Sequence, residues 1–306
     1  MIVKTNRWNK WIGGVVLAVM SATAWAQSTP PIPMKVDFAG VSYDMDRIDR
    51  YERLDREVIA FTYGHTNTLL SIKRANRYAP AITKVLKEQG VPEDFLYLAV
   101  IESHLDNTAV SGAKAAGMWQ FMPATARQYG LEVTDYVDER YDYEKATLAA
   151  CKYLKSAYRK YGCWITVAAS YNGGMGRISD RLEEQNVNSA MDLYLNKETS
   201  RYIYRLLAVK LVMEHPADYG FALSDEQLYQ PLEYDEYKVS SPVESWVTWA
   251  QEHGATYLQV REYNPWIRGD MLPNKTGKTY IVRLPKKASF YRSRITNVTH
   301  NPNWTN

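Results

Sequence analysis

The spacing of apolar residues predicts a chain that is helical over most of its length. Between residues 44 and 90, apolar residues recur every three or four positions, and Gly90 ends the pattern; this period is that of one face of an α-helix. Similar patterns predict helices from Pro92 onward and over residues 123–130, 143–161, 164–172 and 197–214. Strand-like alternation is nearly absent before residue 230. We therefore expect a helical domain over residues 44–225, with its core at 90–215.

The pattern changes after Pro231. Residues 234–239 and 279–285 have the composition of strands, and two short helical stretches lie between them. This order predicts a small α/β module over residues 231–287, so the fold class is mainly α with a small C-terminal α/β module. We expect the proline-rich residues 27–43 to form a flexible leader, and residues 288–306 to form a polar tail that frays.

Residues 1–26 have the layout of a secretory signal peptide. Lys4, Arg7 and Lys10 precede an apolar core, and Ala24-Trp25-Ala26 matches a cleavage site. The apolar core is too short for a comfortable membrane span, and no later segment is long and apolar enough for one. We expect an exported protein without a transmembrane segment in the mature chain.

Removal of this peptide leaves a balanced charge. Three of the 37 Lys and Arg residues are lost, which leaves 34 against 34 Asp and Glu. A nucleic-acid-binding protein needs a basic surface, so we expect no nucleic-acid partner.

The two cysteines, Cys151 and Cys163, are expected to be small buried thiols. The end of a helix over residues 143–161 lies more than ~10 Å from Cys151, whereas bridged Cα atoms lie within ~7 Å. A disulfide stays open as the alternative, because an exported protein can oxidise them. The cysteines are too few for a metal site and the five histidines lack ligand spacing, so no metal or cofactor is expected.

A glutamate at the end of an apolar run is the strongest candidate for chemistry. Glu102 follows the apolar segment Phe95–Ile101, and a helix that is apolar on nearly all sides is buried. Partial burial raises the pKa of a carboxyl group, which can then donate a proton near neutral pH. The small residues from Ser111 to Gly117 would let a ligand approach closely. On the helix pattern alone, a solvated or capping glutamate stays open as the alternative.

Four short motifs follow one another across residues 90–215. They are Glu102-Ser103 with Ser111; Ala115, Gly117 and Gln120; Ala169-Ser170-Tyr171-Asn172-Gly173-Gly174; and Glu198-Thr199-Ser200-Arg201-Tyr202-Ile203. The set resembles the motifs of lytic transglycosylases with a goose-type lysozyme-like (SLT) domain. The run Trp119-Gln120-Phe121-Met122-Pro123 and the preceding helical extension look most like the membrane-bound lytic murein transglycosylase D branch. Lys114, Met118 and Ser170 depart from the commoner residues of the family.

The resemblance implies a lysozyme-like helical domain and an activity. The activity is cleavage of the β-1,4 bond between N-acetylmuramic acid and N-acetylglucosamine in peptidoglycan, with formation of 1,6-anhydromuramoyl products, for cell-wall remodelling. Glu102 would serve as the single catalytic acid and base, whereas ordinary glycosidases use two carboxylates. The implied substrate-binding residues are Ser103, which would orient Glu102; Ser111 and Tyr202, near the scissile sugar; and Gln120 and Asn172, which would shape the glycan groove.

Two further residues of these motifs have alternative interpretations. Met118 is expected in the wall of the groove, with core packing as the alternative. Tyr171 either contacts the substrate directly or is a packed aromatic side chain whose hydroxyl is satisfied within the protein.

The C-terminal module resembles a lysin motif. The resemblance rests on Tyr237-Lys238-Val239, Asn264-Pro265 and Tyr280–Pro285, while the usual Gly-Asp-Thr-Leu is missing. Such a module either binds glycan weakly or braces the catalytic domain.

The implied partners are peptidoglycan glycan strands, and other cell-wall enzymes are candidates. We expect a periplasmic, cell-wall-associated monomer. Two other functions stay open: a hydrolytic muramidase of the same fold, and a non-catalytic cell-wall-binding scaffold.

Overall fold

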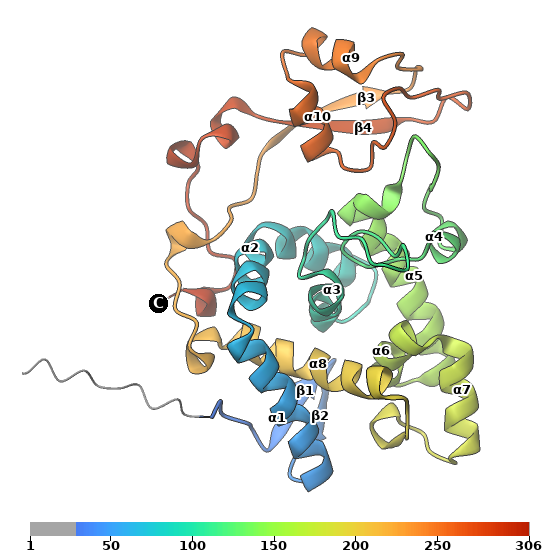
Figure 1. Cartoon of the computed structure of the whole chain (residues 1–306), viewed down its shortest axis with the longest axis vertical. Coiled ribbons are helices and arrows are strands. Elements are labelled where there is room, and N and C mark those ends of the chain that lie inside the picture. Colours follow the sequence, from blue (N-terminus) through green and yellow to red (C-terminus); the bar gives the residue numbers. More distant parts are fainter. Residues whose placement is uncertain (1–28, 306) are drawn as a thin grey trace, which may run out of the picture.

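The computed structural model describes residues 29–305 and is mainly helical, with a small α/β module at one end, as the sequence predicts (Figure 1). The helices of the larger part are α1 (Ile48–Tyr63), α2 (His65–Glu88), α3 (Leu96–Ser103), α4 (Pro123–Gln128), α5 (Tyr143–Tyr161), α6 (Trp164–Gly173), α7 (Met175–Glu184) and α8 (Lys197–Glu214). We call this part the helical domain. Helix α7 was not predicted, because among its residues only Ile178 is buried. The expected signal peptide lies outside the described residues.

The C-terminal module has the predicted order of strand, helix, helix and strand. Its elements are β3 (Tyr234–Val239), α9 (Trp246–Glu252), α10 (Tyr257–Tyr263) and β4 (Tyr280–Pro285). Strands β3 and β4 pair antiparallel, with Tyr234 opposite Pro285 and Val239 opposite Tyr280. Helices α9 and α10 are each preceded by a residue whose side chain caps the helix, Ser245 and Thr256, as serine and threonine commonly do.

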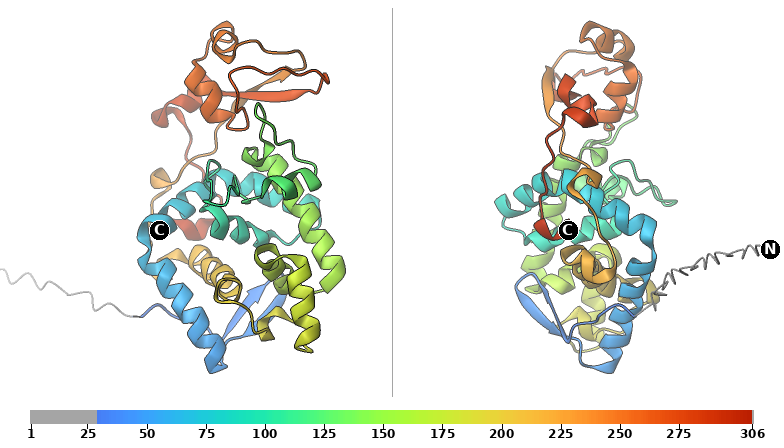
Figure 2. Two further views of the ribbon diagram at one scale, coloured as in Figure 1. Left: turned by 45° about the vertical axis from the view of Figure 1, so that its right-hand side comes forward. Right: turned by 90° about the vertical axis from the view of Figure 1, so that its left-hand side faces the viewer.

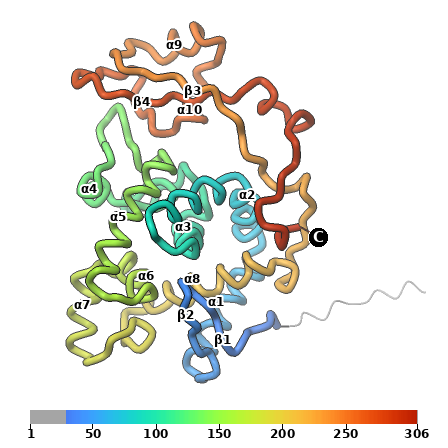
Figure 3. The backbone as a smooth tube through the Cα atoms, turned by 180° about the vertical axis from the view of Figure 1, so that it is seen from behind, coloured from blue at the N-terminus to red at the C-terminus, as the bar shows by residue number. Residues whose placement is uncertain are grey.

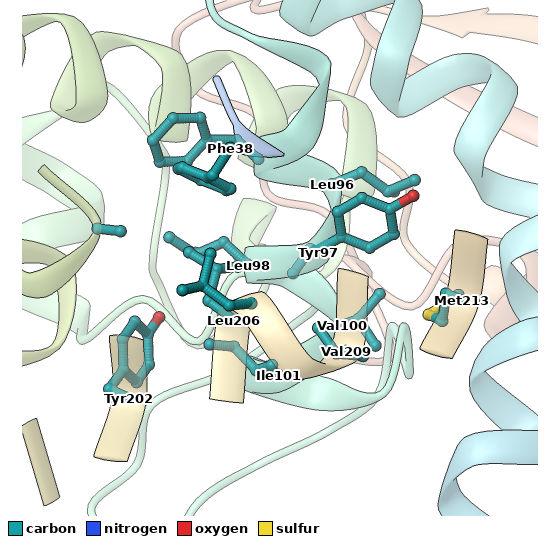
Figure 4. Close-up of a cluster of buried hydrophobic side chains, with 14 of the residues drawn as sticks. Phe38, Leu96, Tyr97, Leu98, Val100, Ile101, Tyr202, Leu206, Val209 and Met213 are labelled. Carbon is teal, nitrogen blue, oxygen red and sulfur yellow. The ribbon is translucent and has the colours of Figure 1, made fainter. Parts of the chain in front are cut away.

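Helix α3 lies at the centre of the helical domain. Every residue from Leu96 to Ile101 is buried, and the helix packs along α8, which contributes Leu206, Val209 and Met213 (Figure 4). Each fully buried side chain of this size contributes roughly 1.5–3 kcal/mol. Helix α3 ends directly after Ser103, because the next residue adopts a left-handed conformation with φ of 54°. The core therefore fixes where the last turn of α3, and Glu102 on it, is placed.

Residues 35–44 form a β-hairpin, so the expectation of a flexible leader over residues 27–43 is wrong for this part. Strands β1 (Lys35–Phe38) and β2 (Val41–Asp44) pair antiparallel. Phe38 is fully buried and its ring meets that of Phe95 edge-on, with centroids 5.4 Å apart. Four-residue strands are too short to give a recognisable alternation, and the aromatic contact with Phe95, the residue directly before α3, holds them in place.

The C-terminal tail is packed and does not fray, contrary to expectation. After β4 the chain returns to the helical domain and ends beside α2 (Figures 1 and 3). Trp304 is 2% exposed, and its Nε1 donates to the carbonyl of Met213 at 2.7 Å. The side chain of Asn76 on α2 bonds to the backbone of Val298 and His300. The buried Trp304 and the hydrogen bonds of the Asn76 side-chain amide therefore anchor a segment whose composition is otherwise polar.

The C-terminal module is docked on the helical domain (Figure 2). Its hydrophobic cluster includes Ala116, Val137 and Tyr141 from the helical domain. Polar contacts reinforce this packing, because Lys278 lies 2.8 Å from Glu132 and 2.7 Å from Glu139. The two parts thus share apolar and ionic contacts.

Both cysteines are free: Cys151 is buried and Cys163 is partly buried. The expectation of unbridged thiols is therefore confirmed, although Cys163 is less buried than expected. Among the helices of residues 29–305, none combines the length and the apolar character needed to cross a membrane.

Candidate active site

The carboxyl group of Glu102 meets a tyrosine from a distant part of the chain. Glu102 lies in the last turn of α3, and Tyr202 lies in the second turn of α8. The Tyr202 hydroxyl donates a hydrogen bond to Oε1 of Glu102 at 2.5 Å. Tyr202 is buried, whereas Glu102 is only partly buried. The hydrogen bond fixes the orientation of the carboxyl group and leaves its second oxygen available.

Burial raises the pKa of Glu102 to about 7. The hydrogen bond from Tyr202 and the positive charge of Arg205 both oppose this rise, whereas the negative charge of Glu198 adds to it. These three residues are spaced by four and three positions on α8, so they share one face of that helix. A carboxyl group with this pKa exists in both protonation states near neutral pH. It can therefore give up a proton and later take one back.

The loop over residues 109–121 is hydrogen-bonded to two side chains near Glu102, one on α3 and one on α6. The Ser103 hydroxyl lies 2.9 Å from the carbonyl oxygen of Met118, and the Tyr171 hydroxyl donates to the carbonyl of Trp119 at 2.7 Å. Ser103 is expected to orient Glu102. Its hydroxyl instead contacts backbone carbonyls, because the buried side chain points toward the loop, and so it holds the loop against α3.

Two of the predicted substrate-binding residues pack with the hydrophobic core, Met118 fully buried within it and Tyr171 partly buried against it. The Met118 side chain is fully buried in the core of the helical domain, so its expected place in the groove wall is wrong. Tyr171 packs edge-on against Phe121 and Tyr153. Of its two interpretations, the packed aromatic with a satisfied hydroxyl fits this geometry. The physical reason is the same for both: the aromatic and apolar residues around them form one continuous core.

The remaining predicted residues fix the loop and the helices around Glu102. The Ser111 hydroxyl accepts from the backbone N–H of Ala115 at 3.0 Å. Gln120 adopts a left-handed backbone with φ of 48°, and its Nε2 donates to the carbonyl of Gly117 at 2.8 Å. The Asn172 side chain accepts from the hydroxyl of Thr199 at 2.9 Å and so links α6 to α8. All three are partly exposed, which leaves them available to a ligand.

Sequence reasoning missed three residues with a part in this site. Glu198 and Arg205 act on the pKa of Glu102 through their charges. The side chain of Arg140 anchors the loop by donating hydrogen bonds to two of the loop's carbonyl groups. The spacing of Glu198, Tyr202 and Arg205 on one helix was a usable signal. No sequence pattern pointed to Arg140, whose role depends on tertiary contacts. Within residues 29–305 no cluster of three or more His, Cys, Asp or Glu could hold a metal ion.

Comparison with protein families gives two matches. Residues 79–193 match the family of transglycosylase SLT domains, and residues 235–288 match the family of soluble lytic transglycosylase C-terminal LysM-like domains. The first range contains Glu102 and the loop beside it. The second contains nearly all of the C-terminal module, from β3 to β4.

Comparison with individual proteins gives matches that cover parts of longer chains. The chain is 30% identical over 231 residues to membrane-bound lytic murein transglycosylase D of Escherichia coli, which covers 74% of this chain and 49% of the relative. It is 35% identical over 136 residues to peptidoglycan transglycosylase gp16 of Escherichia phage T7, covering 43% of this chain and 10% of that one. The chain thus spans about half the length of the first relative and a tenth of the second.

Among solved structures, the fold is similar to that of the 70-kDa soluble lytic transglycosylase of Escherichia coli. The match covers 54% of this chain and 30% of that enzyme's chain. The TM-score is 0.42 and the sequence identity is 19%.

Proposed function

Because the chain carries a transglycosylase SLT domain followed by a LysM-like domain of the soluble lytic transglycosylase type, we propose that it is a peptidoglycan lytic transglycosylase. It cleaves the β-1,4 bond between N-acetylmuramic acid and N-acetylglucosamine and releases 1,6-anhydromuramoyl products. The observation that carries this proposal is Glu102. A partly buried carboxyl with a pKa raised to about 7 lies within the matched SLT range.

The proposed reaction uses one carboxyl group twice. Glu102 first protonates the glycosidic oxygen, and the bond from that oxygen to C1 of the muramoyl residue breaks. The resulting carboxylate then removes the proton from the 6-hydroxyl of the same residue. The 6-oxygen closes on C1, so that no water is consumed and the acid is regenerated. The substrate's own N-acetyl group assists at C1, because this scheme assigns no second carboxylate to that atom.

Tyr202 has the clearest supporting role in this scheme. Its hydroxyl donates to Oε1, so the other oxygen of Glu102 carries the transferable proton. Once the proton has left, the same hydrogen bond stabilises the anion, because bonds to charged acceptors are the stronger ones. Ser111, Gln120 and Asn172 are proposed to contact the glycan, whereas Ser103, Met118 and Tyr171 act from within the protein by fixing the loop.

The proposed domain division assigns catalysis to residues 44–225 and the LysM-like module to 231–287. The proposed substrate, peptidoglycan glycan strands, places the protein in the periplasm, associated with the cell wall and acting as a monomer in remodelling. Other cell-wall enzymes are the candidate protein partners.

A hydrolytic muramidase of the same fold is the second candidate function. The observation that favours it is Glu198, whose negative charge acts on Glu102, because hydrolases pair an acid with a second carboxylate. However, Glu198 is exposed and lies within 3.5 Å of the side-chain amide of Asn172. Its carboxylate is therefore already engaged with the proposed groove.

Product analysis tests the proposal against its alternatives. Purified peptidoglycan is digested with the full mature chain and the products are weighed by mass spectrometry. We expect anhydromuropeptides, which are lighter than hydrolytic products by one water, and their loss in Glu102→Gln. Products heavier by one water would identify a hydrolase. Glycan binding without cleavage in the unchanged chain would identify a scaffold.

A further inference from the structure

A buried arginine forms hydrogen bonds to both ends of a loop segment that lies beside Glu102. Arg140 lies between α4 and α5, and its side chain is 8% exposed. Its Nη1 donates to the carbonyl of Lys114 at 2.8 Å and to that of Phe121 at 2.9 Å. These two residues are the ends of the segment 114–121. One guanidinium group therefore joins both ends of this segment.

The same guanidinium group is oriented by Asp138, whose backbone is hydrogen-bonded to the C-terminal module. Nε and Nη2 of Arg140 bond to the two carboxylate oxygens of Asp138 at 2.9 and 2.7 Å. Both side chains are 8% exposed, and a buried two-point pair of this kind sets the direction of the guanidinium plane. The backbone N–H of Asp138 donates to the carbonyl of Trp266 in the module at 2.8 Å. The neighbouring Val137 forms a β-bridge with Ile267.

The opposite side of the segment 114–121 meets the residues around Glu102. The carbonyl groups of Met118 and Trp119 bond to Ser103 and Tyr171, respectively. Ser103 is the next residue after Glu102, and Tyr171 is close enough for the charge of Glu102 to act on the pKa of its hydroxyl. The segment therefore connects Arg140 on one side with the surroundings of the acid on the other.

The backbone of the segment at Gly117 packs directly against the backbone of Arg140, with no room for a side chain between them. Gly117 has φ of 76°, and a Cβ added there would lie 1.9 Å from the carbonyl oxygen of Arg140. Real Cβ atoms do not approach that closely. A displacement of the Arg140 backbone is therefore transmitted to the loop.

We propose that Arg140 is a positioning residue for Glu102, and that the C-terminal module is an intramolecular brace that holds Arg140 and the segment 114–121 against the acid. This inference rests on the proposed function and adds a mechanical role for the module. The module acts through the backbone ladder at Val137 and Asp138. The guanidinium group of Arg140 holds the segment 114–121 through its two hydrogen bonds to the segment's ends. The segment in turn positions Ser103 and Tyr171 through its own carbonyl groups.

The substitution Arg140→Lys tests the inference. Lysine keeps a positive charge opposite Asp138 but lacks the planar fork that bonds one carboxylate and two carbonyls at once. We expect kcat for the release of anhydromuropeptides to fall on the order of 10-fold, because small misplacements of reacting groups are costly, with KM changed less than about twofold. A loosened loop admits water to Glu102 and so lowers the pKa of its carboxyl group. The alkaline limb of the kcat profile, which is the fall in kcat as Glu102 loses its proton, therefore moves to lower pH. A merely structural role would lower the unfolding temperature without moving that limb.

The matched control is Arg283→Lys. Arg283 makes the same kind of contact from β4 of the module, at 2.8 Å to Glu144 on α5 and 3.0 Å to Glu236, and these partners lie outside the segment 114–121. We expect its kcat and alkaline limb to match those of the unchanged chain. A folded Arg140→Lys with unchanged kcat and limb would overturn the inference, as would an equal shift in Arg283→Lys.

A second variant covers the case in which Arg140→Lys does not fold. Lys278→Gln removes the module's ionic contact with Glu139, the residue before Arg140. A lowered kcat with a downward shift of the limb supports the brace, and an unchanged profile overturns it. The products of the unchanged chain separate this inference from the proposed function: if no anhydro product forms, the function is wrong. If it forms and neither variant alters the profile, only the brace is wrong.

Discussion

The hydroxyl of Tyr202 donates a 2.5 Å hydrogen bond to Glu102, one hundred positions earlier in the chain. Tyr202 is buried, so its hydroxyl cannot exchange this acceptor for water. The bond favours the carboxylate form and lowers the pKa of Glu102, whereas the stronger effect of burial raises it. The balance leaves a pKa of about 7, which suits a group that must act as an acid and then as a base.

The substitution Tyr202→Phe removes this hydrogen bond. The pKa of Glu102 should rise further, so the alkaline limb of activity moves to higher pH. We also expect kcat at the optimum to fall on the order of 10-fold or more, because a hydrogen bond to a charged group contributes about 1.5–3 kcal/mol. Initial rates on purified peptidoglycan between pH 4 and 9, a range from about three units below to about two units above the expected pKa, check both effects.

Tyr204→Phe is the matched control for this prediction. It makes the same change two residues further along α8, where the side chain is buried and faces Arg53 on α1. Its kcat and pH profile should remain those of the unchanged chain. A Tyr202→Phe enzyme with an unmoved limb would show that the hydroxyl does not act on Glu102.

Glu102→Gln should make the protein more stable above neutral pH. The pKa of Glu102 is higher in the folded state than its ordinary value of 4.5. Between these two pH values the unfolded chain loses its proton while the folded chain keeps it, so the stability contribution present below pH 4.5 is lost as pH rises toward 7. A neutral glutamine avoids this loss. We expect the variant to gain roughly 3 kcal/mol at pH 8 and little at pH 4.

Urea unfolding of both proteins across this pH range measures the difference. A constant difference in the free energy of unfolding between pH 4 and pH 8 would contradict the raised pKa. The interpretation as a desolvated acid would then fail, whatever the activity of the variant.

Glu198→Gln distinguishes a neighbouring charge from a second catalytic carboxylate. Because the Glu198 charge raises the pKa of Glu102, its removal should move the alkaline limb to lower pH. We expect kcat to stay within about threefold, since removal of one exposed charge changes energies by less than about 1 kcal/mol. A loss comparable to that of Glu102→Gln, with hydrolytic products in the unchanged chain, would assign Glu198 as the base of a hydrolase.

The sequence allowed good prediction where local pattern and local structure agree. Helix α8 has the predicted bounds Lys197–Glu214, and α3 is buried as its uninterrupted apolar run indicated. The resemblance placed Tyr202 near the scissile sugar, whereas its hydrogen bond to Glu102 was not predicted, because no local rule links residues one hundred positions apart.

The failures share one physical cause, which is packing between distant segments. Phe38 and Trp304 lie in segments of unstructured composition, yet each fills a hydrophobic site in the helical domain. Met118 was assigned to the groove because of its place in a motif, but the core around α3 encloses it. Arg140 lies outside the four motifs, and its importance follows from the carbonyl groups of Lys114 and Phe121, which only the folded chain brings together.

Gly117→Ala tests how tightly the loop beside Glu102 is built. The added methyl group would meet the Arg140 carbonyl at 1.9 Å, and alanine is disfavoured at φ of 76°. We expect a loss of several kcal/mol of stability, combining overpacking of about 1–3 kcal/mol with a strained backbone of about 1–3 kcal/mol. Thermal unfolding measures this loss.

Gly112→Ala provides the control within the same loop. A Cβ at position 112 meets nothing within 4 Å, and its backbone is not in the left-handed region. Its unfolding temperature and activity should stay unchanged. If the two alanine variants were equally stable, the close contact between the loop and Arg140 would be refuted.

Direct titration of the Glu102 carboxyl is the most decisive measurement. The mature chain is labelled with ¹³C at the glutamate side-chain carboxyl groups, and the Glu102 signal is assigned by its disappearance in Glu102→Gln. Carboxyl chemical shifts are then followed as pH is raised. We predict a midpoint near pH 7, in agreement with the raised pKa. A midpoint near its ordinary value of 4.5 would show that Glu102 is already ionised at neutral pH and cannot supply the proton.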